Sequence, residues 1–119
     1  MARVLIVEDE PTDQLLLHSI LKEAGHEIYV ARDGEHAFKT YLRKDIQVVV
    51  TDLHMPDVDG MELIDALPGL YPEAAIIVVS GKGPTLLAQA VNLGAFAALH
   101  KPVVPEKLLE AVENAVSSR

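Results

Sequence analysis

Acidic, hydroxyl and basic side chains follow four apolar runs of the sequence, at residues 4–7, 46–50, 75–79 and 96–99. The side chains that follow these runs are Glu8 and Asp9, Asp52, Ser80, and Lys101. In a parallel sheet the carboxyl ends of the strands lie along one edge, where such proteins place their chemistry. If the runs are strands of one sheet, three carboxylates, a hydroxyl and an ammonium group meet at that edge.

This combination of groups is suited to phosphoryl transfer. Clustered carboxylates repel one another, so some of them bind protons unless a cation neutralises their charge. Oxygen ligands with open coordination positions favour Mg²⁺, for which Glu8, Asp9 and Asp52 are the candidate ligands. Asp52 can then act as a nucleophile toward phosphorus and form an acyl phosphate, while Lys101 and Ser80 hold the transferred oxygens.

The segments between the apolar runs have the features of helices. Three helix starts are marked by prolines, at Pro11, Pro84 and Pro105, because proline suits the first turn of a helix. A further helix is expected to start at Asp33-Gly34. Gly25 and Gly94 are natural helix stops. The apolar residues at helical spacing are Leu16, Leu17, Ile20, Leu21 and Ala24; Ala37, Phe38, Tyr41 and Leu42; Met61, Ile64 and Leu67; Leu87, Ala90 and Val91; and Leu108, Leu109, Val112 and Val116.

With residues 28–31 as a further strand, the chain alternates five times between strand and helix. Crossovers of this length give parallel neighbours with right-handed connections. The strand at 28–31 alternates with polar positions, as at the edge of a sheet. The pattern predicts an α/β protein with one parallel sheet, covered by helices on both faces in a three-layer sandwich.

Composition limits the other classes of function. The 119 residues fit one compact domain, 1–119, and half of them are hydrophobic, which is enough for a core. The net charge of −8 disfavours direct nucleic acid binding, and the absence of cysteine excludes thiolate metal ligands. No segment approaches the ~20 apolar residues of a membrane span, so we expect a cytoplasmic protein without a membrane partner.

The pattern of Glu8-Asp9, Asp52 with Met55-Pro56 and Asp59-Gly60, Ser80-Gly81, and Lys101-Pro102 resembles the receiver domain of two-component response regulators. The resemblance covers the chain from Arg3 to about Val116, with its motifs in register. It implies a flavodoxin-like (βα)5 fold, in which the five strands of the parallel sheet lie in the order 2-1-3-4-5.

The resemblance also implies roles for individual residues. Asp52 would accept the phosphoryl group, while Ser80, Gly81 and Lys101 would contact it. Glu8, Asp9 and Asp52 would bind Mg²⁺ together with the backbone carbonyl of His54, whose side chain would lie near the phosphoryl group. The Lys101-Pro102 peptide bond would be cis.

The resemblance further implies a signalling module rather than a turnover enzyme. A histidine kinase or histidine phosphotransfer protein would supply the phosphoryl group. The face of the fourth helix, fifth strand and fifth helix would contact a downstream target or form a homodimer. The family usually has an aromatic residue at the position of Ala98, so a switch based on that ring is absent; Phe96, expected on the same strand face, is a candidate substitute.

Two other classes of function share part of this pattern. A hydrolase of the haloacid dehalogenase type also uses a strand-end Asp, Mg²⁺ and a Lys, but His54 replaces the second acid of its motif. A flavin-binding module shares the sheet order, but no Ser/Thr-rich phosphate loop follows the first strand. Asp52 could also do no more than cap its own loop.

Overall fold

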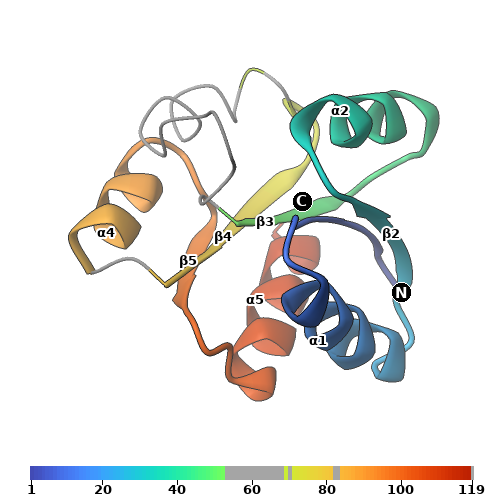
Figure 1. The fold of residues 1–119 in the computed structure, drawn as a ribbon. Helices are drawn as coiled ribbons and strands as arrows, with labels where there is room; N and C mark the ends of the chain where they lie inside the picture. Colours follow the sequence, from blue (N-terminus) through green and yellow to red (C-terminus); the bar gives the residue numbers. More distant parts are fainter. Residues whose placement is uncertain (53–68, 70, 82–83, 119) are drawn as a thin grey trace.

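The computed structural model describes residues 1–52, 69, 71–81 and 84–118 of the chain. Five strands form a single parallel sheet in the order β2-β1-β3-β4-β5, which confirms the predicted flavodoxin-like topology (Figure 1). The strands are β1 Arg3–Val7, β2 Glu27–Ala31, β3 Val48–Asp52, β4 Ala75–Ser80 and β5 Ala97–His100. The described helices are α1 Pro11–Glu23, α2 Gly34–Arg43, α4 Pro84–Asn92 and α5 Pro105–Ser117.

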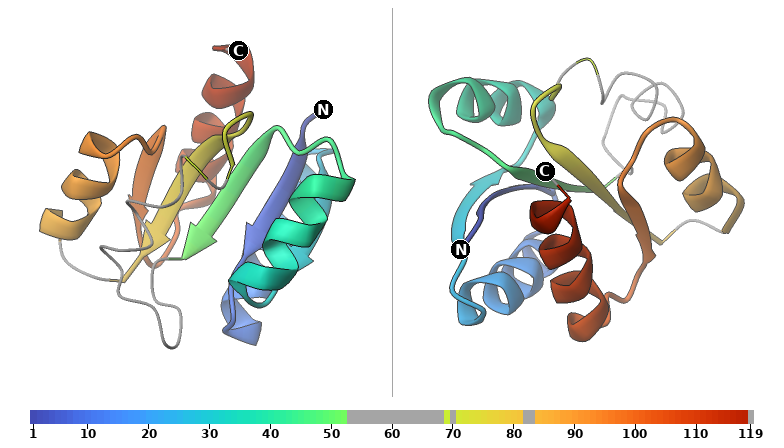
Figure 2. Two further views of the ribbon diagram at one scale, coloured as in Figure 1. Left: turned by 90° about the horizontal axis from the view of Figure 1, so that it is seen from above. Right: turned by 180° about the vertical axis from the view of Figure 1, so that it is seen from behind.

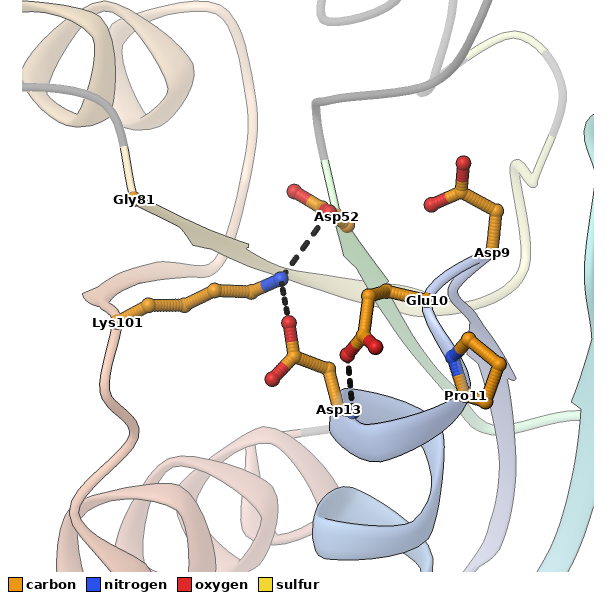
Figure 3. A pocket seen from close by; sticks show the side chains of 7 residues that line it. All are labelled: Asp9, Glu10, Pro11, Asp13, Asp52, Gly81 and Lys101. Atoms are coloured by element: carbon orange, nitrogen blue, oxygen red, sulfur yellow. Dashed lines mark hydrogen bonds and ion pairs between the residues drawn. The ribbon is translucent and has the colours of Figure 1, made fainter.

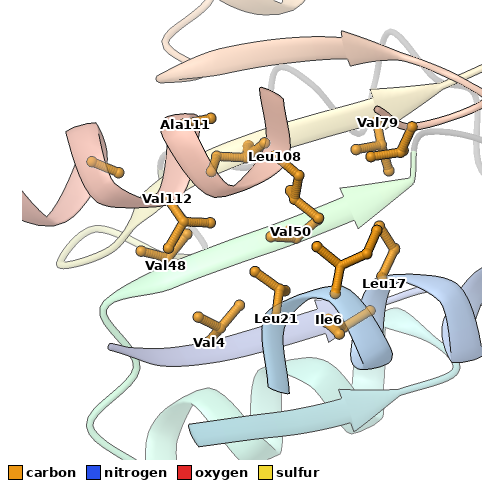
Figure 4. Packing of buried hydrophobic residues seen from close by; sticks show 14 of the residues in the cluster. Val4, Ile6, Leu17, Leu21, Val48, Val50, Val79, Leu108, Ala111 and Val112 are labelled. Atoms are coloured by element: carbon orange, nitrogen blue, oxygen red, sulfur yellow. The ribbon is translucent and has the colours of Figure 1, made fainter. Parts of the chain in front are cut away.

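Helices cover both faces of the sheet, as Figure 2 shows from two further directions. Helices α1 and α5 pack on one face, where Leu17, Leu21 and Leu108 meet Val50 and other strand residues (Figure 4). The other face packs against α2 and α4 through a second cluster that includes Ala37 and Ala90. Because β1, β3 and β4 are covered on both faces, their sequences are continuous apolar runs rather than alternating ones.

The helices begin where the sequence predicts. Pro11 and Pro105 are the first residues of α1 and α5. The Asp33 side chain caps α2 by accepting a hydrogen bond from the His36 N–H at 2.8 Å. Gly25 follows α1 with a φ of 91°, a left-handed conformation that glycine adopts without a steric penalty.

Two strand boundaries differ clearly from the sequence-based expectation, and one predicted helix is not tested. The third strand begins at Val48 rather than at residue 46, because the Ile46 N–H donates to the Lys44 carbonyl in a turn. The fifth strand is Ala97–His100, one residue later than expected. The predicted helix over residues 61–67 lies outside the described residues.

Several apolar residues at helical spacing are exposed, namely Leu16, Phe38, Leu42 and Val91. A helix on a sheet buries only the stripe of residues that faces the strands. In α2, which lies near the edge of the sheet, Ala37 is the buried residue. Periodicity identified these helices but overestimated the width of their buried faces.

Replacing Leu108 tests this assignment of the core. Leu108 is fully buried in α5 and Leu42 is 67% exposed in α2. We expect Leu108→Ala to lower the free energy of unfolding by about 2–5 kcal/mol, because it leaves a cavity under the helix. The matched Leu42→Ala should change it by less than about 0.5 kcal/mol. Urea unfolding followed by circular dichroism measures both, and equal losses would contradict the assignment.

Candidate functional site

The carboxyl ends of four strands bring the predicted residues to one edge of the sheet. Glu8 directly follows β1, Asp52 ends β3, Ser80 ends β4 and Lys101 directly follows β5. Parallel pairing sets this alignment, since Asp52 lies opposite Val79 and the Lys101 N–H donates to the Ser80 carbonyl. The sequence-based prediction that these strand ends converge is therefore confirmed.

The Lys101 ammonium group lies at the centre of the site and binds three carboxylates. Its Nζ donates to Glu8 Oε1 at 2.7 Å, to Asp13 Oδ2 at 2.8 Å and to Asp52 Oδ2 at 3.1 Å. Figure 3 shows the contacts with Asp13 and Asp52. An ammonium group has three N–H donors, so these three acceptors use all of them.

Burial differs sharply among the three acidic partners of Lys101. The Glu8 side chain is 0% exposed and that of Asp52 is 5% exposed, whereas that of Asp13 is 35% exposed. Buried carboxylates need charged or hydrogen-bonding partners to remain in the protein interior. Glu8 has a second one, because its Oε2 accepts the Glu10 N–H at 3.2 Å.

Three acidic side chains also form a group that could hold a metal ion. Glu8, Asp9 and Asp52 each offer a carboxylate oxygen, and these oxygens lie within 4.8 Å of one another. Oxygen-only ligands of this kind suit hard divalent cations. The residues present therefore fit such an ion, and Glu8 and Asp52 are shared between the cation group and Lys101.

Glu8 and the partly buried Lys101, at the centre of the site, have shifted pKa values. Burial raises the pKa of Glu8 to about 7, although the hydrogen bond from Lys101 opposes the shift. Burial lowers the pKa of Lys101, but its hydrogen bonds to Asp13, Glu8 and Asp52 outweigh burial and raise the pKa above its ordinary value. Lys101 is thus a fixed positive charge near neutral pH, while Glu8 lies close to its titration midpoint.

An open hollow of about 660 Å³ gives solvent access to these groups. Its lining residues are Asp9, Glu10, Pro11, Asp13, Asp52, Gly81 and Lys101 (Figure 3). Ser80 is fully buried at the end of β4, next to Gly81 at the rim. The hollow is large enough for a cation and a phosphoryl group beside Asp52.

Sequence reasoning missed Asp13 and the capping role of Glu10. Glu10 caps α1, because its side chain accepts hydrogen bonds from the N–H groups of Thr12 and Asp13. Side chains in the first turn of a helix point back toward its N-terminus. Asp13 comes three residues after Glu10, which precedes Pro11. That spacing was the signal that could have placed Asp13 in the first turn of the helix, with its side chain directed toward the site.

Phe96 does not occupy the surroundings of Ala98, contrary to the expectation that the two share a strand face. Ala98 packs against the cluster on the α2 and α4 side of the sheet. Phe96 precedes β5, is 40% exposed and borders a hollow shared with Lys107 and Glu110 of α5. The Lys101-Pro102 peptide bond is cis, as expected.

His54 lies outside the described residues, and so do the Met55-Pro56 and Asp59-Gly60 pairs. Its predicted contacts with a cation and a phosphoryl group stay predictions. Among the described residues, no helix has the length and apolar character needed to cross a membrane.

Comparison with known proteins identifies the family. The model of the response regulator receiver domain matches residues 4–113. A probable chemotaxis protein CheY from Rhizobium etli is 36% identical, over 93% of this chain and 89% of that protein. A response regulator receiver domain protein from Clostridium thermocellum has a similar crystal structure, with a TM-score of 0.88, 29% identity, and coverage of 99% of this chain and 96% of that one.

A third similar structure is the beryllofluoride-activated NtrC4 receiver domain dimer, solved in solution. Its TM-score is 0.87 at 32% identity, and the match covers 99% of this chain and 98% of that one. Other relatives are much longer, and the chain spans only 17% of the sensory/regulatory protein RpfC of Xanthomonas campestris.

These matches do not support the haloacid dehalogenase alternative. The family match, with the strand order 2-1-3-4-5 and the convergence of acids and lysine at one sheet edge, means that this chain belongs to the receiver domain family of response regulators.

Proposed function

We propose that Asp52 is the phosphoacceptor of this receiver domain and that residues 1–119 act as one such domain. The observation that carries the proposal is the contact of Asp52 with Lys101, beside the two further acids Glu8 and Asp9. A carboxylate with an ammonium group on one side and room for a cation on the other can accept a phosphoryl group without accumulating negative charge.

The proposed donor is the phosphohistidine of a histidine kinase or of a histidine phosphotransfer protein. A carboxylate oxygen of Asp52 attacks phosphorus and forms an O–P bond. The P–N bond to the imidazole breaks at the same time, and its electron pair stays on the imidazole nitrogen. The proposed role of Lys101, of the Ser80 hydroxyl and of the Gly81 backbone is to donate hydrogen bonds to the phosphoryl oxygens. The support is that Lys101 and Gly81 line the hollow beside Asp52 and that Ser80 ends β4, the strand paired with β3.

We propose Mg²⁺ as the cation, with Glu8, Asp9, Asp52 and the carbonyl of His54 as its ligands. When bound, Mg²⁺ supplies positive charge that offsets the negative charge of the carboxylates and the incoming phosphoryl group. The support is the oxygen-only group of Glu8, Asp9 and Asp52, since Mg²⁺ prefers one or two carboxylates with water and phosphate oxygens. The role of His54 rests on the family resemblance alone.

We further propose that the chain is a signalling module whose output face comprises α4, β5 and α5. Val91 in α4 and Phe96 before β5 are exposed apolar residues near this face, and such residues mark contact surfaces when they lie together. The NtrC4 receiver is a dimer, and a homodimer through this face is one proposed output; a downstream protein target is the other. The cytoplasmic location stays a prediction.

Removing the Asp52 carboxylate tests the proposed acceptor. We expect wild-type protein, incubated with acetyl phosphate and Mg²⁺, to gain the mass of one phosphoryl group, and Asp52→Asn to gain none, because an amide oxygen is a poor nucleophile. Intact-protein mass spectrometry measures this. The control is Asp45→Asn, which changes an 88% exposed side chain and should be phosphorylated normally. A gain of one phosphoryl group by Asp52→Asn equal to that of the wild type would contradict the assignment of Asp52.

The raised pKa of Glu8 predicts a pH dependence of Mg²⁺ binding. Burial raises this pKa to about 7, so below pH 7 the cation must displace a proton from Glu8. We expect the apparent Mg²⁺ affinity to fall by up to about tenfold per pH unit below pH 7 and to level off above pH 8. Isothermal titration calorimetry at pH 6, 7 and 8 measures the affinity.

The matched control for this pH dependence is Glu8→Gln, which keeps the shape of the side chain but cannot titrate. It should bind Mg²⁺ more weakly than the wild type at pH 8, with a flatter dependence on pH. The same slope in both proteins would rule out Glu8 as the titrating ligand.

A further inference from the structure

The contact of Asp13 with Lys101 has no role in the proposed phosphoryl transfer. Its Oδ2 lies 2.8 Å from Lys101 Nζ, closer than the Asp52 oxygen at 3.1 Å (Figure 3). The contact is held in place, since the Asp13 N–H donates to the capping Glu10 side chain at 2.7 Å in the first turn of α1. Of the three hydrogen bonds that raise the pKa of Lys101, the bond to Asp13 has the largest effect.

The donors of Lys101 are fully used by Glu8, Asp13 and Asp52. A phosphoryl group on Asp52 can therefore gain a hydrogen bond from Lys101 only if an existing acceptor gives one up. The three acceptors differ in how easily they can do so, and burial decides among them.

Asp13 is the acceptor that can release Lys101 at least cost. Its side chain is 35% exposed, so water can solvate the carboxylate after it leaves the ammonium group. Glu8 is 0% exposed, so water cannot replace its hydrogen bond from Lys101. Asp52 loses its negative charge when the phosphoryl group is attached, so its own hydrogen bond from Lys101 can pass to that group. A second one must come from Glu8 or Asp13. The exchangeable bond is thus the one between Asp13 and Lys101.

The negative charge of Asp13 also favours its competition with a phosphoryl group for Lys101. Glu8, Asp9 and Asp52 form the group that could hold a cation, and Asp13 is not part of it. A cation held by that group would therefore leave Asp13 with its negative charge beside Lys101. A phosphoryl group adds negative charge nearby, so Asp13 both repels that group and competes with it for the same ammonium.

We propose that Asp13 is a positioning residue that competes with the phosphoryl group for Lys101 and so weakens the hold of the site on that group. The proposal rests on the proposed function of Asp52 as phosphoacceptor. Asp13 keeps Lys101 occupied in the resting protein and returns it to that state when the phosphoryl group leaves.

Beryllofluoride, the activating ligand of the similar NtrC4 receiver, serves as a stable probe for the phosphoryl group. Nitrogen-15-labelled full chain is titrated first with Mg²⁺ and then, at saturating Mg²⁺, with beryllofluoride, and both affinities are read from backbone amide shifts. We expect Asp13→Asn to bind beryllofluoride about two- to fivefold more tightly than the wild type, the range typical of a partly exposed ion pair. Its Mg²⁺ affinity should be equal or weaker, because a nearby negative charge is lost.

Tighter beryllofluoride binding without tighter Mg²⁺ binding separates competition from a structural role, which would weaken both. Glu10→Gln is the matched control: it removes a charge from the same hollow, retains an oxygen that can cap α1 and alters no Lys101 contact among those of the described residues. It should give a clearly smaller gain in beryllofluoride affinity. Asp13→Ala, which suits a helix, is the second variant and should behave like Asp13→Asn.

Unchanged or weaker beryllofluoride binding by both Asp13 variants, with normal binding by the wild type, would overturn the competition alone. An equal gain in Glu10→Gln would also overturn it, because general charge would then explain the effect. Failure of the wild type to bind beryllofluoride at saturating Mg²⁺ would instead overturn the proposed function of Asp52, and the competition with it.

Discussion

The sharing of one ammonium group among three carboxylates is the constraint on which the site depends. Lys101 neutralises Glu8 and Asp52, which are almost completely buried, and the protein interior does not tolerate such charges without partners. The four groups come from different parts of the chain: the end of β1, the first turn of α1, the end of β3 and the end of β5. The strands must therefore end in register for the charges to balance.

The apolar sandwich supplies that register. Valine and isoleucine side chains on both faces of β1, β3 and β4 lock the strands between two layers of helices, since a slip of one residue would turn each side chain to the opposite face. The capped first turn of α1 then directs Asp13 toward Lys101. The burial that makes the fold rigid also raises the pKa of Glu8 to about 7, so the resting site is prepared to exchange a proton for a cation.

The sequence was sufficient to predict the convergence of Glu8, Asp52 and Lys101, because strand ends in a parallel sheet have only one edge to share. The sheet order was predicted from the resemblance to the receiver family. The sequence was not sufficient to predict the contact of Asp13 with Lys101. That contact depends on the direction of a side chain in the first turn of α1, and the residue that caps this helix also had to be located. Phe96 was assigned to the wrong surroundings for a similar reason: alternation holds only inside a strand, and β5 begins one residue later. Exposure of Leu42 depends on how α2 lies against the sheet edge, which periodicity does not encode.

Attachment of the phosphoryl group to the Asp52 carboxylate underlies every step proposed for this site, and locating that group is the decisive experiment. Borohydride reduces an acyl phosphate to the corresponding alcohol, which converts a phosphorylated aspartate to homoserine. After phosphorylation with acetyl phosphate and Mg²⁺, reduction and proteolysis, tandem mass spectrometry reads the modified position. We expect homoserine at position 52 alone; homoserine at position 9 or 13, or phosphate retained on a histidine, would contradict the assignment of Asp52.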